Sequence, residues 1–88
     1  MTLDSGQAVL RGALGEIGAS HDDLPWGELT RHSLRELGVT SLRLFELVSA
    51  IEELGGFVFD DDDVEASRFE APAALADMID GYLARRDA

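Results

Sequence analysis

The sequence predicts a small all-α protein: an antiparallel bundle of three main helices with one or two short helices between them. Three observations support this fold class. The chain has 88 residues, which suffice for one small hydrophobic core. Apolar residues recur at helical spacing in three separate stretches, and no stretch alternates apolar and polar residues as a strand does. We therefore expect one domain, residues 1–88, with its core at about 5–85.

The first helical stretch covers residues 5–17. Its apolar residues fall at i, i+1, i+4, i+5 and i+8, which places them on one face of a helix. These residues are Val9, Leu10, Ala13, Leu14 and Ile17. We expect Asp4 or Ser5 to cap the N-terminus of this helix and Gly18 to end it.

Residues 18–40 form a long connection that is rich in turn-forming residues. A connection of this length inside a small domain ordinarily contains some structure of its own. We expect a short helical turn near 28–37, and we expect three leucines of this segment to lie on the core: Leu29, Leu34 and Leu37. Trp26 is the expected anchor of the connection, with a hydrogen-bond partner for its indole N–H.

The strongest helical pattern covers residues 41–54. Its apolar residues form one stripe that faces the core: Leu44, Leu47, Val48, Ile51 and Leu54. Thr40 is placed as the N-cap residue, and the Gly-Gly pair at 55–56 is expected to end the helix.

A short apolar link at 57–59 leads to the acidic run 60–63, which we expect to open a short helix through about residue 68. The last helix is expected to start at Pro72 and to run to about Arg85. Its buried stripe contains Leu75, Met78, Ile79, Tyr82 and Leu83.

Charge and composition exclude several classes of function. Eighteen acidic residues against seven arginines and no lysine give a net charge of −11. Such a surface repels nucleic acid and anionic membranes, and it favours basic patches on other proteins. The absence of cysteine excludes disulfides, thiolate metal sites and a cysteine nucleophile. No signal peptide or membrane-spanning run is present, so we expect a cytoplasmic monomer.

Ser41 stands where the polar connection gives way to the strongest helix. A hydroxyl at this point is exposed, and it lies at the positive end of the helix dipole beside backbone N–H groups that have no partner within the helix. These properties suit a side chain that carries a phosphate ester.

The residues around Ser41 resemble the signature of the acyl carrier and peptidyl carrier proteins. Residues 37–42 read Leu-Gly-Val-Thr-Ser-Leu, 46–48 read Glu-Leu-Val and 51–53 read Ile-Glu-Glu. The resemblance implies an acyl carrier protein-like bundle with 4′-phosphopantetheine, taken from coenzyme A, esterified to Ser41. The thiol of that cofactor carries acyl or aminoacyl groups as thioesters, and this fits a chain that has no cysteine.

The resemblance also implies the partners. These are a phosphopantetheinyl transferase and the enzymes that load and process the cargo through basic docking patches. The partner contacts it implies are Thr40, Leu42, Arg43 and Glu46. Leu42 lies off the core stripe, so we expect it to be exposed. We interpret Phe45 as a core residue; the alternative is that it walls a pocket for a bound acyl group.

Two residues depart from the family pattern. Thr40 replaces the usual aspartate before the serine, and Arg43 stands on the exposed side of the first turn where the family has an acidic or neutral residue. Together they shift the local charge by about two units toward positive, so we expect altered partner choice and slower modification by a generic transferase. These departures favour specialised biosynthesis of polyketides or nonribosomal peptides over housekeeping fatty-acid synthesis.

The other candidate sites are weak. Counted as a calcium loop, the run from Asp60 to Asp63 lacks the required glycine and ligand spacing. His21 and His32 are eleven residues apart without further ligands, so we expect no metal. No Gly-x-Ser-x-Gly motif surrounds Ser41, and we predict that the chain has no catalytic residue and is not an enzyme.

Two alternatives remain at this point. Thr40 leaves open an unmodified acidic helical adaptor that has lost the cofactor. A small serine hydrolase built on Ser41, His32 and an aspartate is a more remote reading.

Overall fold

The computed structural model describes residues 5–19, 24–64 and 71–86, and within them it contains helices and turns but no strand. The all-α prediction is therefore confirmed. In chain order the elements are α1 (Gly6–Glu16), α2 (Trp26–Leu29), α3 (Ser41–Gly55), the 3₁₀ helix η1 (Asp61–Asp63) and α4 (Pro72–Arg86).

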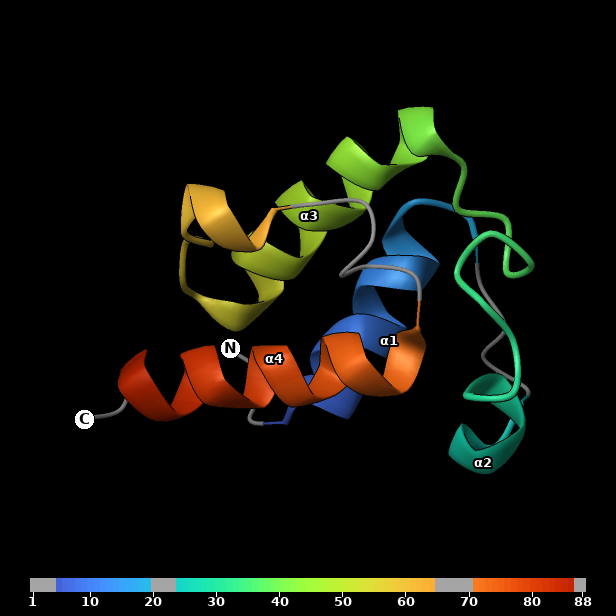
Figure 1. The fold of residues 1–88 in the computed structure, drawn as a ribbon, viewed down its shortest axis with the longest axis horizontal. Coiled ribbons are helices and arrows are strands. Elements are labelled where there is room, and N and C mark those ends of the chain that lie inside the picture. Colours follow the sequence, from blue (N-terminus) through green and yellow to red (C-terminus); the bar gives the residue numbers. More distant parts are fainter. Residues whose placement is uncertain (1–4, 20–23, 65–70, 87–88) are drawn as a thin grey trace.

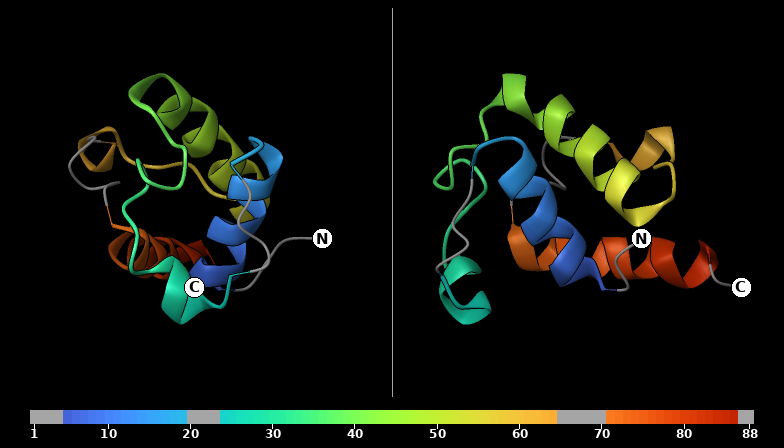
Figure 2. Two further views of the ribbon diagram at one scale, coloured as in Figure 1. Left: turned by 90° about the vertical axis from the view of Figure 1, so that its right-hand side faces the viewer. Right: turned by 180° about the vertical axis from the view of Figure 1, so that it is seen from behind.

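Helix α1 lies between α3 and α4 and packs against both (Figure 1). Helix α2 stands apart at one end of the molecule, as the views from the side and from behind confirm (Figure 2). No helix in the described parts of the chain is long and apolar enough to cross a lipid bilayer.

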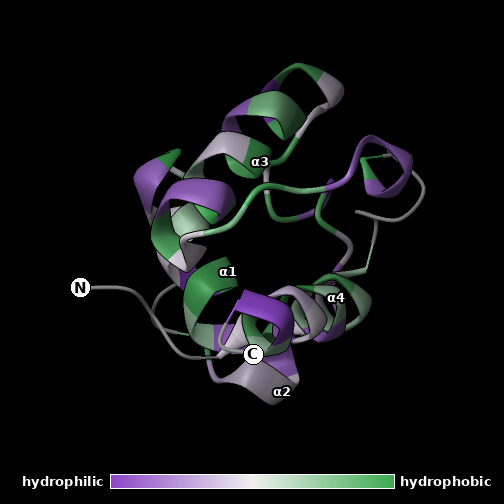
Figure 3. Cartoon of the chain, turned by 90° about the vertical axis from the view of Figure 1, so that its left-hand side faces the viewer, coloured by the Kyte–Doolittle hydropathy of each residue, from purple (hydrophilic) through white to green (hydrophobic). Residues whose placement is uncertain are grey.

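The core follows the predicted stripes. Four residues of α1 are at most 1% exposed: Val9, Leu10, Ala13 and Leu14. They meet fully buried residues of α3 and α4, namely Leu47, Ile51, Leu75 and Ile79. The three main helices each carry hydrophobic and hydrophilic residues (Figure 3), so burial of one face drives the packing.

Two side chains cap the N-terminus of α1. The Ser5 hydroxyl accepts a hydrogen bond from the Ala8 amide at 3.1 Å, which confirms Ser5 as a capping residue. Asp4, the other candidate, lies outside the described residues. The second cap comes from α4, where the Asp80 carboxylate accepts a hydrogen bond from the Gly6 amide at 2.6 Å. This contact ties the start of α1 to α4.

Helix α1 ends at Glu16, and Gly18, the predicted stop, follows the C-cap residue Ile17 in a left-handed conformation with φ of +76°. The Ala19 amide donates to the Leu14 carbonyl at 2.9 Å and closes the last turn.

The connection before α3 differs in part from the prediction of a helical turn at 28–37. The α-helical segment covers only Trp26–Leu29, and residues 33–37 form a separate turn. Pro25 starts α2, since its carbonyl accepts hydrogen bonds from the amides of Glu28 and Leu29. The three leucines are buried as expected: Leu29, Leu34 and Leu37. Trp26 is half-buried and packs against the core, in keeping with its predicted role as an anchor.

The far end of α3 is held by α4. The Arg86 guanidinium donates to the Gly55 carbonyl at 2.6 Å, so it satisfies one of the carbonyls left over at the end of the helix. The Glu52 carboxylate accepts from the Phe59 amide at 2.8 Å and fixes the link that follows. Helix α3 therefore ends at the predicted glycine pair with additional side-chain support.

Aromatic contacts fix the same region. The Phe57 and Tyr82 rings stack with centroids 4.9 Å apart, and Phe59 packs edge-on against both. The Tyr82 hydroxyl accepts from the Asp60 amide and donates to the Asp63 carboxylate. Burial raises the pKa of the Tyr82 hydroxyl, and the hydrogen bond to Asp63 adds to this effect. These two hydrogen bonds to Tyr82 hold the acidic run, and with it η1, against α4. The predicted continuation of the short helix to residue 68 lies outside the described residues.

The contact between α1 and α4 requires a glycine at position 6, because a Cβ built there would lie 2.0 Å from the Ala76 carbonyl oxygen. We predict that Gly6→Ala lowers the free energy of unfolding by about 1–3 kcal/mol through overpacking. Chemical denaturation followed by circular dichroism measures the change.

Gly81 provides the matched control, since nothing lies within 4 Å of a Cβ built there inside α4. Gly81→Ala is expected to stabilise the protein by up to about 1 kcal/mol through helix propensity. Equal effects of the two substitutions would contradict the close approach of α1 and α4.

Candidate functional site

Ser41 is the first residue of α3, a helix of 15 residues, and it is exposed. The Thr40 carbonyl opens the helix by accepting from the amides of Arg43 and Leu44, both at 3.0 Å. The amides of Ser41 and Leu42 precede the first intrahelical donors, so they have no acceptor within α3. The first turn of α3 contains no acidic residue. A phosphate at the Ser41 hydroxyl would meet free N–H groups and no carboxylate from that turn.

Thr40 occupies the predicted N-cap position with an extended backbone, φ −79° and ψ 172°. Its side chain makes no capping hydrogen bond, so the Thr40 hydroxyl plays no part in closing the helix. The residue is exposed beside Ser41.

The Arg43 side chain contacts neighbouring groups that the sequence did not predict. Its side chain is 37% exposed, and its Nε lies 3.7 Å from a carboxylate oxygen of Glu46. Its Nη2 lies 3.5 Å from where a Cβ of Gly18 would stand, so the guanidinium reaches the C-terminal end of α1. A cation is favoured at that negative end of a helix. The prediction of an exposed Arg43 is therefore corrected: it joins the start of α3 to the end of α1, and Glu46 offsets part of its charge.

Leu42 and Phe45 form an apolar surface next to Ser41. They lie three residues apart on one side of α3 and are 88% and 71% exposed. The exposure of Leu42 agrees with the prediction. The interpretation of Phe45 as a core residue is wrong, because the buried stripe of α3 faces α1 and Phe45 lies outside that stripe. Two adjacent exposed side chains of this size suit a docking surface.

Among the described residues, the remaining candidates do not gather into a site. No group of three or more potential metal ligands gathers in the part of the chain that the structure describes. His32 is exposed, with its Nδ1 3.8 Å from a Glu36 carboxylate oxygen, and His21 lies outside the described residues.

The turn before α3 is closed by a reciprocal capping box that the sequence analysis missed. The Ser33 amide donates to the Glu36 carboxylate at 2.9 Å, and the Glu36 amide donates to the Ser33 hydroxyl at 3.1 Å. The sequence pattern that indicates this capping box is a serine three residues before a glutamate, here Ser-Leu-Arg-Glu at 33–36. This turn buries Leu34 and Leu37 immediately before Ser41 and so helps to set the start of α3.

Comparison with known families identifies the chain. The family model described as Phosphopantetheine attachment site matches residues 8–79, which is well over half of the 88 residues. The chain belongs to this family. The comparisons with curated proteins and with solved structures found no match.

The cofactor of this family is 4′-phosphopantetheine. The start of α3 fits such a group, because it offers an exposed hydroxyl, two free backbone amides and a first turn without carboxylates. As a phosphopantetheine carrier, the protein interacts with a modifying enzyme and with processing enzymes.

The Ser33–Glu36 turn gives a pH-dependent prediction. The hydrogen bond from the Ser33 amide, supported by the Ser33 hydroxyl, lowers the pKa of the Glu36 carboxyl below its ordinary value of 4.5. A carboxyl with a lowered native-state pKa stabilises the fold above that ordinary value, and the contribution is lost as the pH falls through the lowered one. We expect the turn to loosen only in that acidic window.

The fluorescence of Trp26, the single tryptophan, reports on this connection during acid titration. Side-chain NMR of Glu36 gives its titration midpoint directly. Glu36→Gln is the control, because the amide cannot ionise and this component of the pH dependence should disappear. A Glu36 midpoint at or above 4.5 would contradict the capping role.

Proposed function

We propose that Ser41 is the residue that carries 4′-phosphopantetheine and that the protein delivers acyl or aminoacyl groups to a series of enzymes. The observation that carries this proposal is the exposed serine at the first position of α3, within a chain that belongs to the phosphopantetheine attachment family. When bound, the cofactor supplies a thiol for thioester formation.

The chain contributes position rather than catalysis. Helix α3 presents the Ser41 hydroxyl at the surface, and the amides of Ser41 and Leu42 complement a phosphodiester there. Covalent attachment raises the effective concentration of the cargo at each partner active site. We propose that the protein is itself no enzyme and that activation of the hydroxyl is supplied by the transferase.

Partner enzymes are proposed to contact the surface around Ser41. Leu42 provides the apolar anchor and Phe45 joins it, whereas Thr40, Arg43 and Glu46 set the local charge. Exposed ion pairs are individually weak, so the protein can leave each partner in turn.

The pathway we propose is polyketide, nonribosomal peptide or related specialised biosynthesis in the cytoplasm. Support comes from the first turn of α3, where Thr40 and Arg43 leave no acidic residue next to the serine. Partners that recognise an acidic first turn would bind this surface less well than partners adapted to it.

Intact mass spectrometry tests the attachment residue. Incubation with coenzyme A and a broad-specificity phosphopantetheinyl transferase should add one phosphopantetheinyl group to the wild-type chain and none to Ser41→Ala. The exposed Ser49 on the same helix gives a matched control, because Ser49→Ala should leave the modification intact.

Retention of the added mass in Ser41→Ala would place the cofactor elsewhere. Failure of several transferases to modify the wild type would favour the unmodified adaptor, and hydrolysis of an ester by the unmodified protein would favour the hydrolase.

A second prediction concerns docking. Leu42→Ala and Phe45→Ala should each raise the KM of the transferase for this protein by about fivefold, corresponding to about 1 kcal/mol for an exposed apolar contact. Val58, which is 77% exposed beyond the other end of α3, is the control. Val58→Ala should leave KM unchanged, and all three variants should keep wild-type stability within about 0.5 kcal/mol. Equal effects on KM at all three positions would contradict a localised docking surface.

A further inference from the structure

The connection that leads into α3 differs in charge from the chain as a whole. Its described segment, residues 24–43, contains three arginines and two glutamates and carries a net charge of +1, whereas the whole chain carries −11. Helix α2, the turn at 33–37 and the start of α3 lie at one end of the molecule in Figure 1 and Figure 2. Arginines therefore outnumber acidic residues in a segment that adjoins Ser41.

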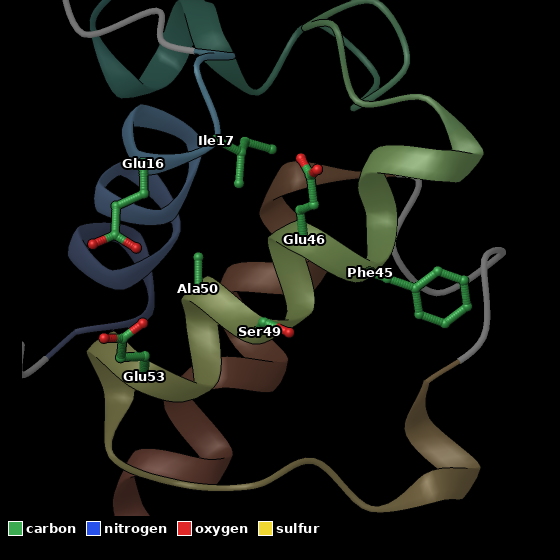
Figure 4. A pocket seen from close by; sticks show the side chains of 7 residues that line it. All are labelled: Glu16, Ile17, Phe45, Glu46, Ser49, Ala50 and Glu53. Atoms are coloured by element: carbon green, nitrogen blue, oxygen red, sulfur yellow. The ribbon is translucent and has the colours of Figure 1, made fainter.

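Two groups of acidic side chains lie on other elements. Glu16, Glu46 and Glu53 line an open pocket between the end of α1 and the middle of α3 (Figure 4). The aspartates at 60–63 lie beyond the other end of α3, where Tyr82 holds them against α4. The surface of the described connection is therefore set by its own side chains.

Trp26 provides a hydrogen-bond donor on this surface. The residue is half-buried and packs against the core. None of the described residues accepts a hydrogen bond from its indole N–H, so the partner expected from the sequence is not found among them. The indole nitrogen is accessible to solvent, because no buried side-chain nitrogen of a described residue lacks a partner. A tryptophan with an anchored ring and an accessible N–H is typical of protein interfaces.

Arg31 and Arg35 add charged donors to the same segment. Leu34 and Leu37 are each 2% exposed on the inner side of the turn, which leaves Arg35 exposed on the outer side. Arg35 forms no ion pair with any described residue. The Arg31 side chain is 76% exposed, and its Nη1 lies 3.9 Å from a carboxylate oxygen of Glu28. An exposed pair of this kind contributes little, so both guanidinium groups are available to a partner.

The turn that carries Arg35 is held in one conformation. Its capping box joins Ser33 and Glu36 in both directions, and the Leu37 amide donates to the Ser33 carbonyl at 3.1 Å. The Glu36 carboxylate is engaged in this box and lies 3.8 Å from Nδ1 of His32. Because the turn is ordered before binding, a partner does not have to fix its backbone.

We call Trp26, Arg31 and Arg35 the donor surface. The polar groups of all three side chains are donors, and none is an acceptor. A matching ligand must present acceptors, and carboxylates match well because a guanidinium group binds them through two parallel hydrogen bonds. Tryptophan and arginine are also enriched among the residues that dominate binding energy at interfaces. These properties fit an acidic segment of another protein.

Other acidic ligands fit less well. Nucleic acid would bring a long row of phosphates toward a chain of net charge −11 and be repelled. A second copy of the chain carries the same −11 and is repelled as well. A short segment with two or three carboxylates confines its charge to the donor surface, and acidic groups beyond the Debye length of about 8 Å are largely screened from it.

We propose that the donor surface docks an acidic segment of a partner protein, with carboxylates on Arg31 and Arg35 and a further acceptor on the Trp26 indole N–H. Its charge preference is opposite to that of the basic patches favoured by the net charge of the chain. The surface requires neither the cofactor nor the Ser41 hydroxyl. The proposal therefore goes beyond carriage at Ser41 and stands or falls separately.

An NMR titration tests the proposal with the full chain carrying Ser41→Ala, so that no cofactor is present. The probe is a synthetic peptide with blocked ends, in which three glutamates alternate with serines and lie on one side of the extended chain. We expect saturable shifts at the amides of residues 26–37 and at the Trp26 indole N–H. A peptide with glutamine in place of each glutamate should bind about tenfold more weakly, at about threefold for each exposed ion pair lost.

Matched variants separate the donor surface from the general charge of the chain. Arg35→Gln should weaken the glutamate peptide about threefold, and the fold should be unaffected because Arg35 pairs with no described residue. Arg85→Gln removes another exposed arginine, on α4, and should leave the affinity unchanged. Trp26→Phe keeps an aromatic ring and removes the N–H, so it should weaken binding about fivefold.

Several results would overturn the proposal. These are equal losses in Arg35→Gln and Arg85→Gln, equal binding of the two peptides, shifts centred on Leu42, and the absence of saturation. Tighter binding of a short oligonucleotide than of the glutamate peptide would assign the surface to nucleic acid. Dimerisation of the wild type that Arg35→Gln removes would assign it to a second copy. None of these results bears on the mass gain at Ser41, which tests carriage alone.

Discussion

The burial of one face of α1 between α3 and α4 is the interaction on which the rest of the structure depends. Each of the outer helices packs more extensively on α1 than on the other. The position of α3, and with it Ser41, is therefore set through α1. Gly6 permits the close approach of α1 to α4, and Asp80 fixes it by capping the first amide of α1. At the opposite end of α1, Arg43 reaches Gly18 and ties down the start of α3.

Much of this arrangement could be predicted from the sequence, because the buried stripes are local patterns with helical spacing. The apolar stripe of α3 and the glycine pair after it predicted the end of that helix to within one residue. The same local reasoning placed Ser41 at a helix start, since a polar connection changes there into an amphipathic helix. The exposure of Leu42 followed from its position off the stripe.

The missed features divide into two kinds. The Asp80–Gly6 cap and the approach of Arg43 to Gly18 depend on tertiary structure, and no local pattern encodes a contact across 74 residues. Phe45 is different, because at about 100° per residue it lies roughly 120° from the centre of the stripe. Its large apolar ring suggested burial, and the angular position was the better guide.

The attachment of the apolar link at 57–59 to the far end of α3 keeps the acidic run that follows it away from Ser41. Glu52 binds the Phe59 amide, so the link enters the acidic run 11 residues along α3 from Ser41, roughly 16 Å along the axis. The Debye length at physiological ionic strength is about 8 Å, so the field of those aspartates is largely screened before it reaches the serine. Arg43 and Glu46 are the charged side chains of α3 nearest to Ser41, and the serine is electrostatically insulated from the four aspartates at 60–63.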